Sequence, residues 1–134
     1  ALGHSNFKIE DGTMEFGVGH HGEAGTKVEK LKSASEMAQE MAETILNDFD
    51  FEEGKEVAVM LSSLGATPVM ELYVLYDEVE KVLAKAGHKV WKTYIGNYVT
   101  SLDMNGASLT IVDLDDEIKE LLSEPAVPIG MKNY

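Results

Sequence analysis

The sequence feature that most constrains the fold is a short, uninterrupted apolar run at residues 57–61, which reads VAVML. Gly54 precedes the run and a Ser-Ser-Leu-Gly segment follows it, so signals typical of turns bound it on both sides. A strand with one face in water alternates apolar and polar residues, whereas this run has no polar position. It therefore predicts a strand that is buried on both faces of its sheet.

A helical pattern precedes this strand. Ser33 and Glu36 have the spacing of a capping box, in which a serine begins a helix and a glutamate three residues later reaches back to it. Met37, Met41 and Ile45 then recur at four-residue spacing, which places them on one helical face. A methionine stripe is also typical of adaptable binding grooves. We expect this one to belong to the core.

A longer helix is predicted after the strand. Thr67 has the residue type of an N-cap and Pro68 that of a first helical residue. Gly87 marks the other end. The residues between them are apolar over a wide arc, so we expect the helix to be buried against a sheet or a partner.

Two further strands and a helix follow. Residues 90–95 form one strand, in which alternation predicts that Trp91 and Tyr94 point to opposite faces. Residues 108–112 form another, and Asp115 caps a short helix with the apolar stripe Ile118, Leu121 and Leu122. No helical pattern separates these two strands. The element order predicts a single α/β domain over residues 1–134, a layered sandwich with a mixed, partly parallel sheet flanked by helices.

Composition limits the classes of partner. The 134 residues include 11 Lys and Arg, 24 Asp and Glu and no cysteine, for a formal net charge of −13. This balance argues against binding to nucleic acid or to an anionic membrane surface. The absence of cysteine excludes disulfides, thiolate catalysis and cysteine-ligated zinc. No apolar run approaches the roughly 20 residues that cross a bilayer, so a cytoplasmic location is the default expectation.

The candidate reaction site is a glycine-rich loop at residues 16–25, FGVGHHGEAG, which follows a predicted strand at residues 14–18. Glycine permits sharp turns and close approach of a ligand, and histidine is the side chain most available as a neutral nucleophile near neutral pH. His20 and His21 lie at the apex, whereas His4 is expected to be an exposed loop histidine. No third ligand at helical spacing accompanies the pair, so no metal site is predicted.

Three segments, residues 16–25, 64–73 and 96–106, resemble the dihydroxyacetone-binding subunit of dihydroxyacetone kinases. In that family a histidine of the glycine-rich loop holds dihydroxyacetone as a covalent hemiaminal, and His21 stands at its position. The resemblance implies that His21 is the catalytic residue and that Gly19 and Gly22 lie against the substrate. The alternative for His21 is a strand-end histidine that is hydrogen-bonded to the backbone. His20 replaces a usual aliphatic residue and Ala24 a usual proline.

The resemblance also carries expectations about partners. Glycines 17, 19 and 22 match a dinucleotide fingerprint only weakly, and no Walker sequence occurs. We therefore expect no cofactor on this chain, with ATP or ADP-Mg on a separate kinase subunit or domain, or a phosphotransferase relay as the phosphate donor. Family members carry an additional N-terminal half with acid-base residues, so the isolated chain is expected to be an inactive C-terminal portion. A homodimer is also expected.

Two other functions remain open from the sequence. Some members of the family keep the covalent histidine, lose phosphoryl transfer and act as dihydroxyacetone-binding coactivators of a transcription regulator. The third alternative is a dimerisation and packing module, in which the apolar arc of the helix over residues 67–86 forms an interface.

Overall fold

The computed structural model describes residues 8–52 and 54–131. The backbone forms two compact units, one that ends at Ser33 and one that begins at Ala34. The expectation of a single domain over residues 1–134 stays a prediction. His4 lies outside the described residues.

The first unit is a β-hairpin. Strand β1 (Thr13–Phe16) pairs antiparallel with β2 (Lys27–Lys30). The first strand was predicted, but β2 was not, because its sequence KVEK lacks the apolar alternation of a half-buried strand. Pairing with β1 supplies its backbone hydrogen bonds, and ion pairs from Lys27 and Lys32 to Glu29, at 3.2 and 2.7 Å, hold its charged side chains.

The second unit contains a three-stranded sheet in the order β4-β3-β5. Strand β3 (Glu56–Ser63) pairs parallel with β4 (Lys89–Gly96) and antiparallel with β5 (Ala107–Asp113). A helix connects β3 to β4, which allows these two strands to run parallel. No helix lies between β4 and β5, and β5 pairs antiparallel with β3. The prediction of a mixed, partly parallel sheet is confirmed.

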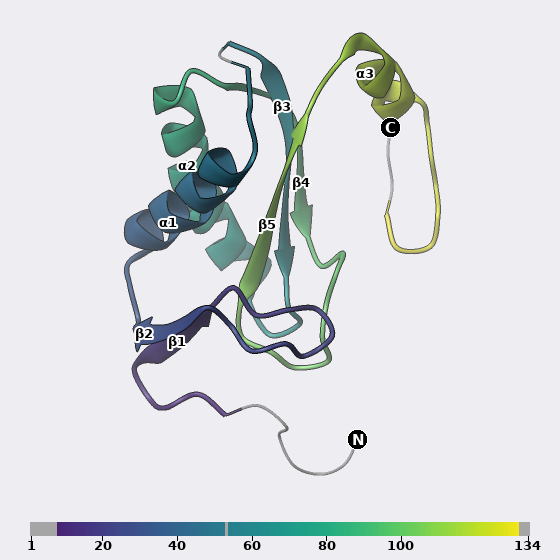
Figure 1. Cartoon of the computed structure of the whole chain (residues 1–134). Helices are drawn as coiled ribbons and strands as arrows, with labels where there is room; N and C mark the ends of the chain where they lie inside the picture. The colour runs from purple at the N-terminus through teal and green to yellow at the C-terminus, as the bar shows by residue number, and fades with distance from the viewer. Residues whose placement is uncertain (1–7, 53, 132–134) are drawn as a thin grey trace. The chain divides into compact units, whose positions relative to one another are not determined.

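Helices α1 (Ala34–Asp48) and α2 (Val69–Lys85) lie on the same side of this sheet (Figure 1). Helix α1 begins directly after Ser33, as predicted. Alternate residues of β3 pack against the two helices, and this cluster is the hydrophobic core. Its buried members are Ala38, Val57, Val59, Leu61, Leu72, Leu75, Val79 and Leu83. Met37 and Met41 pack against it, which confirms their place in the core.

Helix α3 (Asp116–Ser123) lies on the opposite side of the sheet (Figure 1). Its Lys119 forms an ion pair of 2.8 Å with Glu56 of β3, and Lys92 of β4 donates a hydrogen bond of 2.6 Å to the carbonyl oxygen of Leu122. The Asp115 side chain accepts a bond of 2.7 Å from the backbone N–H of Ile118, so the predicted N-cap is confirmed. Helices on both sides make the unit a layered α/β sandwich.

Within the described ranges, no helix is long and apolar enough to cross a bilayer.

The charge pair between β3 and α3 predicts a dependence of stability on pH. A hydrogen bond from Lys119 is the largest of the effects that hold the pKa of Glu56 below its ordinary value, and a hydrogen bond from Lys89 is the second. Desolvation by burial acts in the opposite direction and is smaller. Since a lowered folded-state pKa favours the folded state only while the carboxylate is ionised, this stabilisation is lost as pH falls from about 4.3 through the folded-state pKa. Urea unfolding between pH 7 and pH 3 should therefore show a shallower acid decline for Glu56→Gln than for the wild type. Equal declines would contradict this prediction.

The start of α2 differs from the prediction. Pro68 occupies the N-cap position with no side-chain cap, and the helix begins at Val69. The Thr67 hydroxyl is instead bonded to the backbone of Gly106, which lies 39 residues away. Thr67 is therefore not the N-cap, because a tertiary contact takes its side chain. The C-terminal end of α2 agrees with the prediction, since Gly87 has a positive φ of 88° just after the helix.

The apolar arc of α2 is buried only on one side. Leu72, Leu75, Val79 and Leu83 face the core, whereas Val69, Met70, Tyr73 and Val74 are exposed. Burial against the sheet is therefore confirmed for this side of the helix, and burial of the other side against a partner stays a prediction. In the apolar stripe of α3, Ile118 and Leu122 are half-buried and Leu121 is exposed.

The prediction that Trp91 and Tyr94 face opposite sides is also wrong. The Lys92 ammonium lies 5.7 Å from the centroid of each of the two rings, so both rings share its side of the sheet. The register between β3 and β4 shifts between Val57 and Ala58, and Trp91 is the extra residue. A β-bulge interrupts the two-residue alternation on which the prediction rested.

Candidate functional site

The glycine-rich loop connects the two strands of the hairpin, and hydrogen bonds fix its base. The backbone N–H of Thr26 donates to the carbonyl oxygen of Phe16 at 2.7 Å, which extends the β1–β2 pairing by one step. The backbone N–H of Gly25 donates to the Glu15 carboxylate at 2.6 Å. Both ends of the loop are therefore anchored to the end of β1.

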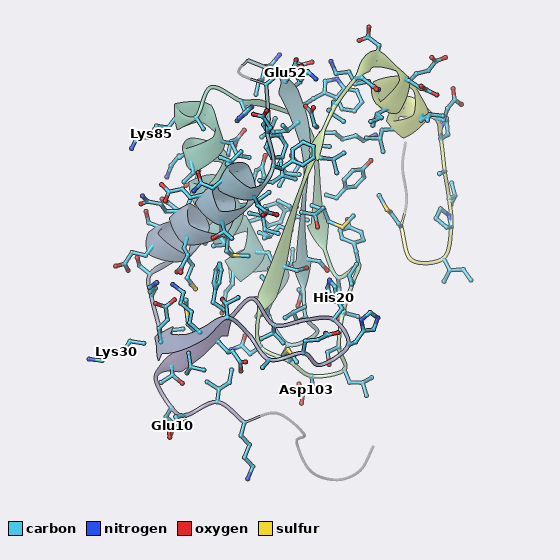
Figure 2. All side chains as sticks on the ribbon, in the orientation of Figure 1. Glu10, His20, Lys30, Glu52, Lys85 and Asp103 are labelled. Atoms are coloured by element: carbon cyan, nitrogen blue, oxygen red, sulfur yellow. The ribbon has the colours of Figure 1, made fainter. Side chains whose placement is uncertain are left out.

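The loop ends in a tight turn that carries both histidines. The N–H of Gly19 donates to the carbonyl oxygen of Glu23 at 3.0 Å, and the N–H of Gly22 donates to the carbonyl oxygen of Gly19 at 3.1 Å. The second bond closes a β-turn in which His20 and His21 are the two central residues. His20, labelled in Figure 2, lies at the tip of this loop. His20 therefore lies in a turn and not on an extended strand.

The two glycines that were expected to contact substrate have clear roles in the turn. Gly22 has φ of +92°, a conformation that costs an L-residue about 1–2 kcal/mol. At Gly19 an added Cβ would lie 2.8 Å from the Cβ of Glu23, so a side chain there would displace Glu23. Both N–H groups donate within the loop. A contact of Gly19 or Gly22 with substrate stays a prediction.

The His21 side chain is 91% exposed, and its neighbour within the loop is Glu23. The backbone N–H of His21 donates to Oε2 of Glu23 at 3.1 Å, and Nδ1 of its ring lies 3.6 Å from Oε1 of the same carboxylate. Glu23 was not predicted as a site residue, although a glutamate two residues after the histidine is a visible signal in the sequence. An imidazole with an open face and a carboxylate beside Nδ1 can act as a nucleophile.

The other two segments that resemble the family lie together at one edge of the three-stranded sheet. Gly65 forms an isolated parallel bridge with Met104, and the N–H groups of Leu64 and Ala66 donate to carbonyl oxygens of Gly106 and Met104, each at 3.1 Å. The N–H of Gly65 donates to the Ser63 hydroxyl at 3.0 Å. These three N–H groups are satisfied internally, so they are not available to bind an anion.

Ser62 fixes the start of the connection between β4 and β5. Ser62 is buried, with 1% of its surface exposed. Its hydroxyl oxygen accepts hydrogen bonds from the backbone N–H groups of Tyr98 at 2.9 Å and Val99 at 3.0 Å. Because Ser62→Ala leaves both donors without this acceptor, we expect a loss of about 1–3 kcal/mol in the free energy of unfolding. Urea denaturation measures it.

The matched control for Ser62→Ala is Ser123→Ala, which removes an exposed hydroxyl that bonds only within its own helix turn. We expect this control to change stability by less than about 0.5 kcal/mol. Equal effects of the two substitutions would contradict the role assigned to Ser62.

Other features of the described chain do not provide a competing site. The glycine-rich loop joins two antiparallel strands and no helix, so it lacks the strand-to-helix context of a dinucleotide fingerprint. Among the residues that the structure describes, no three His, Asp or Glu side chains are grouped to hold a metal ion. A mostly apolar pocket of about 160 Å³ lies between β4 and α3, and no predicted site residue lines it. Its lining residues are Tyr94, Leu121, Leu122, Glu124, Ala126, Pro128 and Met131.

One family model covers both the glycine-rich loop and the two sheet-edge segments. The model of the Dak1 domain matches residues 1–129 of the chain. The chain belongs to the Dak1 family. Among curated Dak1 relatives, the dihydroxyacetone-binding subunit of PTS-dependent dihydroxyacetone kinase 2 from Listeria innocua is 37% identical over 123 residues. The operon coactivator DhaQ from Lactococcus lactis is 32% identical over 114 residues.

Solved Dak1 structures share the fold. A dihydroxyacetone kinase operon co-activator superposes with a TM-score of 0.84 at 30% identity, covering 91% of this chain and 38% of that one. The dihydroxyacetone kinase of C. freundii, in complex with AMP-PNP and Mg²⁺, gives 0.75 at 28% identity, covering 87% and 21%. The matches to the Listeria and Lactococcus relatives cover 92% and 84% of this chain but 37% and 35% of those proteins. The chain therefore spans well under half the length of these relatives.

Proposed function

We propose that this chain is the substrate-capturing part of a dihydroxyacetone kinase, and that His21 binds dihydroxyacetone as a covalent hemiaminal. The observation that supports this role is the position of the His21 ring, which is 91% exposed on a closed β-turn. A ring packed among other side chains could not reach a ketone. The family to which the chain belongs includes dihydroxyacetone-binding subunits, which supports the choice of substrate.

The proposed step is an addition to the carbonyl group. The lone pair of one ring nitrogen attacks the carbonyl carbon of dihydroxyacetone as the C=O π pair moves onto oxygen. The resulting alkoxide takes up one proton and the imidazolium loses one, so a neutral hemiaminal forms without a co-reactant. Glycerol has no carbonyl group to attack, so this step selects the ketone over the corresponding polyol more sharply than a few hydrogen bonds would.

Phosphoryl transfer is proposed for the full assembly. In this scheme ATP or ADP-Mg is bound by a separate subunit or domain, a homodimer forms, and the isolated chain has no kinase activity. Residues of the longer relatives' remaining length would supply the acid-base groups. The proposed setting is the cytoplasm, where small phosphorylated and free ketoses are metabolised.

A second function has its own support. The co-activator structure superposes on this chain with a higher TM-score than the kinase structure does, 0.84 against 0.75. A dihydroxyacetone-binding coactivator would keep the capture step and omit phosphoryl transfer. The two alternatives are distinguished by a coupled assay of the full-length protein with a nucleotide-binding subunit, since only the kinase consumes the phosphate donor.

Mass spectrometry of the intact protein under non-denaturing conditions tests the capture step. After incubation with dihydroxyacetone we expect one adduct that disappears on dilution, and no adduct with glycerol. Because ketones also condense with lysine amines, the adduct must be assigned to the peptide that contains residues 16–25 by fragmentation. Absence of a reversible adduct on that peptide would refute the proposal.

A further inference from the structure

The hairpin loop contains one carboxylate that faces the proposed nucleophile. Glu23 contacts His21 twice, through the bond of 3.1 Å from the His21 backbone N–H to Oε2 and through the 3.6 Å approach of Nδ1 to Oε1. Its own carbonyl oxygen accepts the N–H of Gly19, so the backbone of Glu23 is fixed at the same time. The carboxylate is thus held on the Nδ1 side of the ring.

This arrangement has a chemical consequence for the ring. Neutral imidazole carries its proton on either nitrogen, and the partner of one nitrogen decides which tautomer is present. A carboxylate only accepts hydrogen bonds, so beside Nδ1 it favours the tautomer with the proton on Nδ1. The lone pair of Nε2 is then free. In this tautomer Nε2 is the ring nitrogen that is available to attack a carbonyl carbon.

We infer that Glu23 is a positioning residue for His21, setting the Nδ1–H tautomer that makes Nε2 the nucleophile. The inference rests on the proposed function for its link to dihydroxyacetone. As the Nε2–C bond forms, the ring becomes an imidazolium, and the adjacent carboxylate stabilises that charge until Nδ1 gives its proton to solvent. The separation of 3.6 Å is an ion-pair distance, and catalytic hydrogen bonds commonly shorten when substrate binds.

The loop geometry also explains why Glu23 can occupy this place. Its side chain folds back over Gly19, where a Cβ would collide with it. The neighbouring carboxylate of Glu15 is used differently, since it accepts the backbone N–H of Gly25. The same hairpin therefore offers a matched control, because Glu15 and Glu23 carry the same charge and both accept a backbone N–H.

The test compares Glu23→Gln with Glu15→Gln. In each variant the amide oxygen can still accept the backbone N–H, so the loop keeps that bond while one negative charge is removed. The ¹⁵N shifts of the His21 ring report the tautomer directly. We expect Glu23→Gln to move the population toward Nε2–H and to slow adduct formation by about two- to fivefold, as for an exposed charge pair. Glu15→Gln should change neither quantity.

Two readouts separate the inference from the proposed function. A wild-type tautomer ratio in Glu23→Gln, or slower capture without a change in tautomer, would overturn the positioning role. Failure of the wild-type chain to form any adduct would refute the proposed function, whereas a tautomer shift confined to Glu23→Gln would still support the effect of Glu23 on the ring.

Discussion

Replacing His21 with alanine is expected to abolish the reversible dihydroxyacetone adduct, whereas replacing His20 is expected to leave it close to the wild-type level. The two residues are the central positions of one β-turn, and both are exposed. The two histidines therefore have similar access to solvent and lie in the same turn. They differ in that the carboxylate of Glu23 faces the ring of His21. Intact-mass spectrometry at saturating dihydroxyacetone measures the adduct in both variants.

The alanine substitution should preserve the loop. Among the described residues no non-glycine residue has a positive φ, so alanine fits both turn positions without strain. The N–H of residue 21 remains able to donate to Glu23. Loss of the adduct in His21→Ala would thus report the missing nucleophile. Persistence of the adduct in His21→Ala, or its loss in His20→Ala alone, would assign capture to a different group.

Replacing Leu61 with alanine is expected to cost about 2–5 kcal/mol in the free energy of unfolding. Leu61 is fully buried in the central strand β3, with Ile95 of β4 and Leu109 of β5 as its register partners. The surrounding strands are fixed by backbone hydrogen bonds and can collapse only partly into the space. Since domains of this size are stable by about 5–15 kcal/mol, the loss would be a large fraction of the total.

Leu102→Ala is the matched control for Leu61→Ala. Leu102 is 92% exposed in the connection between β4 and β5, and the same atoms are removed. We expect a change of less than about 0.5 kcal/mol. Urea denaturation followed by circular dichroism gives both values. Similar losses in the two variants would contradict the assignment of β3 as the centre of the core.

The elements that were predicted correctly are those with strong local patterns. The apolar run at residues 57–61 forms most of the central strand. Met37 and Met41, which are four residues apart, lie on the face of α1 that packs against the core. Asp115 caps α3 because its bond to Ile118 spans only three residues. The glycine-rich loop was located because its composition is unusual, although its turn conformation was not anticipated.

The elements that were missed depend on contacts between distant residues. Strand β2 has a charged sequence and exists through its pairing with β1. Thr67 does not cap the helix because its hydroxyl forms hydrogen bonds with the carbonyl oxygen and the N–H of Gly106, which lies 39 residues away. The bulge at Trp91 results from the register in which β3 pairs with β4. The residue pattern of β4 alone does not predict that register.

The sequence by itself determined the family, the mixed α/β architecture and the proposed place of His21, because those follow from motifs and short-range periodicity. Only the tertiary structure decided that both histidines occupy one β-turn and that Glu23 lies on the Nδ1 side of the His21 ring. The physical reason is that a carboxylate acts on an imidazole through distance and direction, and the backbone hydrogen bonds around Gly19 set both.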